Sequence, residues 1–78
     1  MINLKKRKEE IVKILGKDIF LYELKEKYPF TISDIPKCLT DLEKELYVVS
    51  FLAYHNFLSV NQSVISHSIK NNKVLYVK

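Results

Sequence analysis

The side chains that most often carry chemistry are few and dispersed in this 78-residue sequence. Cys38 is the single cysteine, which excludes a disulfide within the chain, and His55 and His67 do not stand at metal-ligand spacing around it. The carboxylates of residues 34–45 spread around a predicted helix instead of converging on a pocket. A single glycine excludes a glycine-rich phosphate loop. We therefore expect no catalytic residue, no metal site, no cofactor and no enzyme activity.

The cationic side chains are the remaining candidates for binding. The chain has 13 Lys and Arg against 9 Asp and Glu, a formal net charge of +4 and a pI near 9.2. Cations exceed acids in residues 1–30, acids exceed cations in residues 31–46, and residues 70–78 hold lysines without acids. The run at residues 5–8 is either a solvated helix surface or a phosphate contact. Cations in a first helical turn oppose the helix dipole, which favours a binding partner.

Apolar spacing and capping residues predict two helices in the first part of the chain. Residues 3–15 have the pattern of an amphipathic helix, and Gly16 stands where a left-handed cap would end it. Asp18 is an N-cap candidate for a second helix, which Pro29 ends because the residue before a proline avoids the helical region. Residues 30–32 then form a short turn.

The rest of the chain predicts one more helix followed by strands. Ser33 is a capping residue, and an apolar stripe predicts a third helix over residues 34–46. Strand formers dominate residues 46–60, with a hairpin tip at residues 55–56, and they continue to residue 69. A helix over residues 46–60 stays open as the alternative, since short apolar runs do not distinguish the two. Residues 70–77 predict a turn with an asparagine pair and a final strand.

Three helices followed by a hairpin is the order of a winged helix-turn-helix domain. Residues 33–45, SDIPKCLTDLEKE, resemble the recognition helix of winged-helix repressors, which often have a polar cap before Leu-x-x-Leu-Glu-Lys-Glu. The resemblance covers about residues 4–78 and departs from the family at Leu46, where a glycine usually opens the wing. It implies an α+β fold for a single domain over residues 1–78: a three-helix winged helix-turn-helix with a C-terminal antiparallel β-hairpin or small sheet.

The resemblance also implies a function, a small sequence-dependent regulator of transcription that binds double-stranded DNA. The candidate DNA-contacting residues are the exposed cations and the outer face of the predicted third helix, namely Lys5, Lys6, Arg7, Lys8, Lys37, Thr40, Lys44, Lys70 and Lys73. Six phosphate contacts would give a log–log salt dependence with a slope of about −5 per subunit. The helix over residues 34–46 has more acids than cations, so we expect the N-terminal and wing lysines to supply most of the contacts.

A protein-interaction module is the alternative function, docking through the acidic third helix or the apolar segment 46–60. A continuous basic face that joins residues 5–8 to residues 70–73 would favour DNA, whereas scattered cations would favour a protein partner. The uncharged stretch has more apolar side chains than a small hairpin covers, so we expect a homodimer that uses Phe51, Tyr54 and Phe57.

The sequence also bears on location. The start, MINLKKRKEE, has no apolar run of the kind that signal peptides carry, and the single cysteine fits a reducing compartment. Residues 46–60 are shorter than the roughly 18–20 apolar residues that span a membrane and include polar side chains. We therefore expect a cytoplasmic protein without a membrane segment.

Overall fold

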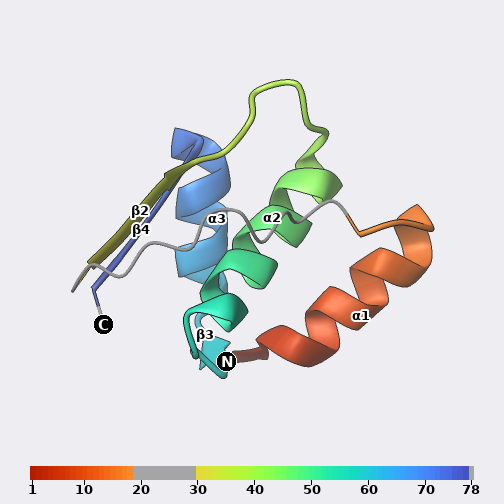
Figure 1. Ribbon diagram of the computed structural model, residues 1–78, viewed down its shortest axis with the longest axis horizontal. Helices are drawn as coiled ribbons and strands as arrows, with labels where there is room; N and C mark the ends of the chain where they lie inside the picture. Colours follow the sequence, from red (N-terminus) through yellow and green to blue (C-terminus); the bar gives the residue numbers. More distant parts are fainter. Residues whose placement is uncertain (19–29, 78) are drawn as a thin grey trace.

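A computed structural model describes residues 1–18 and 30–77, with side chains for residues 1–18 and 34–74 (Figure 1). The fold is α+β, as predicted, and combines three described helices with small two-stranded antiparallel sheets. In chain order the elements are β1 (Ile2–Asn3), α1 (Leu4–Leu15), β2 (Phe30–Asp34), α2 (Asp41–Tyr54), β3 (Ser59–Val60), α3 (Gln62–Asn71) and β4 (Lys73–Val77).

The first helix agrees with the sequence prediction at both ends. Asn3 is the N-cap of α1, and its side-chain oxygen accepts a hydrogen bond from the backbone N–H of Lys6. Gly16 ends the helix with a φ of 73°, and its N–H donates to the carbonyl of Val12. The predicted second helix lies outside the described residues, except for its proposed cap Asp18.

The central element is α2, which packs against α1 on one side and α3 on the other (Figure 1). Residues 46–52 of this helix are all buried. The prediction of strands over residues 46–60 is therefore wrong for most of the segment, and the helical alternative is correct as far as Tyr54. A helix that is buried on every side needs apolar residues around its whole circumference. This burial favours valine and aromatic side chains in α2, although their local propensity is for strands.

The prediction of a helix over residues 34–46 is wrong at its start. Residues 30–34, including the predicted turn at 30–32, form strand β2, and α2 begins only at Asp41. Thr40 is the N-cap: its hydroxyl accepts from the N–H of Glu43, whose carboxylate accepts from the N–H of Thr40. The helix therefore begins after the capping box at Thr40 and not after Ser33. Pro36 also opposes an earlier start, because the residue before a proline favours an extended conformation.

The C-terminal part contains a helix where extended chain was predicted. Residues 62–71 form α3, and His55 caps α2 next to Asn56, which has a φ of 72°, so residues 55–56 are a helix end and not a hairpin tip. The predicted turn and final strand are confirmed by Asn72, with a φ of 53°, and by β4.

The predicted small antiparallel sheet is confirmed, but its strands are not successive. β4 pairs with β2 in a register that runs from Phe30 opposite Val77 to Asp34 opposite Lys73. β3 pairs instead with β1, so that Ile2 lies opposite Val60. Among the described elements, no two strands that follow each other in the chain form a wing.

Candidate functional site

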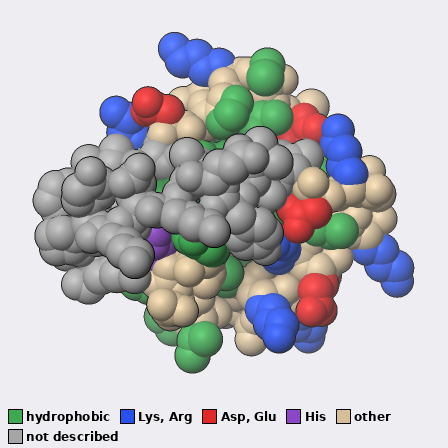
Figure 2. All heavy atoms as spheres, viewed as in Figure 1, with side chains coloured by type: hydrophobic (Ala, Val, Ile, Leu, Met, Phe, Trp, Pro, Cys, Tyr) green, Lys and Arg blue, Asp and Glu red, His purple; other side chains and the backbone are tan. Residues whose placement is uncertain are grey.

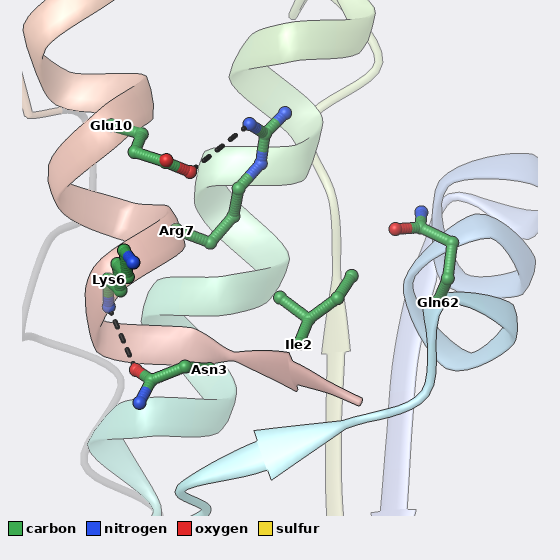
Figure 3. A pocket seen from close by; sticks show the side chains of 6 residues that line it. All are labelled: Ile2, Asn3, Lys6, Arg7, Glu10 and Gln62. Carbon is green, nitrogen blue, oxygen red and sulfur yellow. Dashed lines mark hydrogen bonds and ion pairs between the residues drawn. The ribbon is translucent and has the colours of Figure 1, made fainter.

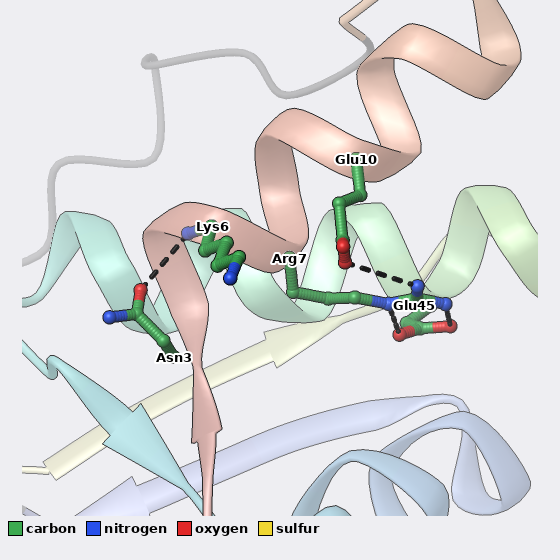
Figure 4. Close-up of polar contacts among 5 residues, drawn as sticks. All are labelled: Asn3, Lys6, Arg7, Glu10 and Glu45. Atoms are coloured by element: carbon green, nitrogen blue, oxygen red, sulfur yellow. Dashed lines mark hydrogen bonds and ion pairs between the residues drawn. The ribbon is translucent and has the colours of Figure 1, made fainter.

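The structure places the predicted DNA-contacting cations in different environments. Arg7 makes a bidentate pair with Glu45 of α2, with Nε to Oε2 at 2.6 Å and Nη2 to Oε1 at 3.0 Å (Figure 4). Its Nη1 lies 3.5 Å from Oε1 of Glu10. These contacts raise the pKa of Arg7, mainly through the hydrogen bonds to Glu45. A fork of this kind is among the stronger charge-assisted contacts, so Arg7 joins α1 to α2.

Other cations also pair within the chain. Ion pairs connect Lys8 to Asp18 at 3.2 Å, Lys17 to Glu43 at 3.2 Å and Lys73 to Asp34 at 3.5 Å. Arg7, Lys17 and Lys73 of the basic ends therefore pair with acids of the middle of the chain.

The predicted outer face of the third helix is likewise engaged within the chain. Lys44 Nζ donates to Oδ1 of Asn72 at 2.9 Å. The side-chain amide of Asn72 donates to the carbonyl of Ile35, and the N–H of Ile35 donates to the backbone carbonyl of Asn72. Thr40 is occupied by the capping box. Hydrogen bonds from the Thr40 backbone, Lys17 and the Thr40 hydroxyl lower the pKa of Glu43. Among the side chains described, the lysines that make no ion pair or side-chain hydrogen bond are Lys5, Lys6, Lys13, Lys37 and Lys70.

The two basic segments lie at opposite ends of α3. Residues 5–8 lie in the first turns of α1. Two of them, Lys6 and Arg7, line the same surface hollow as Gln62, the first residue of α3. Lys70 is in the last turn of α3, whose 10 residues span about 15 Å. In the view of Figure 2, cationic side chains stand at separate places around the edge of the molecule, several beside acids. On the face seen in Figure 2 the cations of the described residues are separated from one another.

The hollow has a volume of about 390 Å³ and is open to solvent (Figure 3). Its lining comes from β1, the first turns of α1 and the start of α3: Ile2, Asn3, Lys6, Arg7, Glu10 and Gln62. Pairing of β1 with β3, extended by a 3.0 Å hydrogen bond from the N–H of Leu4 to the carbonyl of Leu58, brings these elements together. Of the predicted binding residues, Lys6 and Arg7 line this hollow.

Two highly exposed apolar side chains belong to the same β1–β3 ribbon. Met1 is 88% exposed and Leu58 is 83% exposed, while the third large exposed apolar residue of the described part, Ile14, lies farther along α1. The Sδ of Met1 accepts a hydrogen bond from the hydroxyl of Ser59 at 3.7 Å, which places Met1 beside the strand that follows Leu58. The sequence analysis missed Leu58 and Gln62, because the strands that gather them are two residues long and far apart in the chain.

The predicted dimer contacts are partly buried in the chain itself. Phe51 is 2% exposed, with its ring centroid 6.2 Å from that of Tyr47 and 4.8 Å from that of His55. Its assignment to a dimer interface is wrong, because a core ring has no area left for a second chain. Tyr54 and Phe57 pack against the same core with part of their surface exposed, and their role in a dimer stays a prediction.

Cys38 is exposed in the loop before α2. In the part of the chain that the structure describes, no cluster of three or more His, Cys, Asp or Glu side chains could hold a metal ion. None of the helices within the described ranges is long and apolar enough to cross a bilayer. Comparison with known proteins gives no match to a family model, to a curated protein or to a solved structure.

Proposed function

We propose that this protein is a protein-interaction module that docks through the corner formed by β1, β3 and the first turns of α1 and α3. We call this surface the ribbon corner and define it by Met1, Ile2, Lys6, Leu58 and Gln62. The observation that carries the proposal is the exposure of Met1 and Leu58, the two apolar residues that directly precede the paired strands β1 and β3. Protein interfaces combine apolar contacts with a polar rim in this way.

Much of the surface that the sequence suggested for a protein partner is engaged within the fold. Glu43 and Glu45, in the acidic first turns of α2, are bound by Lys17 and Arg7. Residues 46–52, the apolar part of the helix, are buried. Leu58, in the last part of the apolar segment 46–60, stays exposed, and the docking that we propose uses it.

DNA binding by a winged-helix domain is the second candidate, supported by the net charge of +4 and the resemblance of residues 33–45. Those residues fall on the end of β2, a loop and the first turns of α2, so they do not present one continuous reading helix. On α1, Lys5 and Lys6 form no ion pair among the described residues, and each precedes a glutamate by four residues. Such a surface attracts phosphates weakly.

Selection from a random peptide library on the immobilised full chain tests the proposal. Peptides that bind the wild-type chain should lose binding to Leu58→Ser and keep binding to Ile14→Ser, the matched control on α1. Both side chains are largely exposed, at 83% and 67%, so both variants should keep the wild-type midpoint of thermal unfolding. Equal loss of binding in the two variants, or no enrichment of any peptide, would contradict docking at the ribbon corner.

A further inference from the structure

We draw no further inference here: the strongest candidate, the open hollow between β1, the first turns of α1 and the start of α3, belongs to the site already described, the charges of its two cations are balanced by those of Glu10 and Glu45, and nothing in the structure shows what covers it.

Discussion

The first five residues of α2 and the seven that follow have opposite surroundings. Residues 41–45 are charged except for Leu42, and ion pairs connect Glu45 to Arg7 of α1 and Glu43 to Lys17, just after α1. Residues 46–52 carry no charge and are buried on every side. One helix thus holds the fold together by directional charge contacts at one end and by apolar packing at the other, and the two should respond differently to mutation.

The same contrast bears on function. A helix that reads DNA needs an exposed face along several turns, and α2 offers none within residues 46–52. Its acidic end binds cations of α1 and of the segment after it, which withdraws Arg7 and Lys17 from any phosphate. Near the start of α1, Lys5 and Lys6 stay exposed, together with Met1 before β1.

The largest expected effect is in the buried half of α2. Leu52 is fully buried, so Leu52→Ala should lower the free energy of unfolding by about 3 kcal/mol, through lost burial and a cavity. Leu42 is half-buried in the charged part of the helix, so Leu42→Ala should lower the free energy of unfolding by only about 1–2 kcal/mol. Urea denaturation measures both. Equal losses would show that the two parts of the helix are packed alike.

The next effect concerns the fork between α1 and α2. Glu45→Gln leaves the guanidinium of Arg7 partly buried with less compensating charge, and we expect a loss of about 1–2 kcal/mol. Glu9→Gln, an exposed change on α1 without an ion pair, is the control and should be nearly neutral. In a double-mutant cycle with Arg7→Met the two losses should not add. Additive losses would mean that the fork contributes nothing to stability.

A smaller effect of opposite sign is expected at Ser50. Its hydroxyl is buried in α2 and has no hydrogen-bond partner among the described residues, so Ser50→Ala removes an unsatisfied polar group at little cost in volume. The free energy of unfolding should rise by up to about 1 kcal/mol, seen as a higher thermal midpoint. A fall would indicate that the hydroxyl is hydrogen-bonded in solution.

The smallest effect is the acid dependence of the charged end. The pKa of Glu43 is lowered below its ordinary value of 4.5 in the folded chain. Its contribution to stability is therefore complete above that value and is lost as the pH falls through the lowered folded pKa. Glu43→Gln should reduce the dependence of the urea midpoint on pH in this acidic range. Leu52→Ala is the control and should shift the urea midpoint by the same amount at every pH. If the dependence of the urea midpoint on pH is the same in Glu43→Gln and in wild type, Glu43 is not the cause of that dependence.

Local signals predicted the first helix and the final strand, but not the bounds of α2 or the presence of α3. The amphipathic spacing of residues 3–15 and the single glycine after them were sufficient for α1 and its cap. The buried part of α2 has no polar face, so its periodicity is invisible and its valines and aromatics favoured strands. Ser33 was preferred over Thr40 as a cap, although Thr40 is followed three residues later by the glutamate of a capping box.

The candidate site was only partly predictable for a related reason. Lys6 and Arg7 stood out as a basic cluster, but nothing local shows that Glu45 would engage one and not the other. Leu58 and Gln62 reach the hollow through the pairing of β1 with β3, two strands of two residues each. Contacts between residues so far apart in the sequence depend on tertiary packing. A short segment of the sequence therefore shows no pattern that predicts them.

The salt dependence of binding to duplex DNA tests most directly whether residues 5–8 and 70–73 act together on phosphates. With half of the described cations engaged within the fold, we expect weak binding, a log–log slope no steeper than about −3 and no change in that slope on replacing Lys70 and Lys73 with alanine. A slope near −5 that flattens by roughly two in this double variant would show one continuous phosphate-binding face, and would contradict the assignment of the ribbon corner to a protein partner.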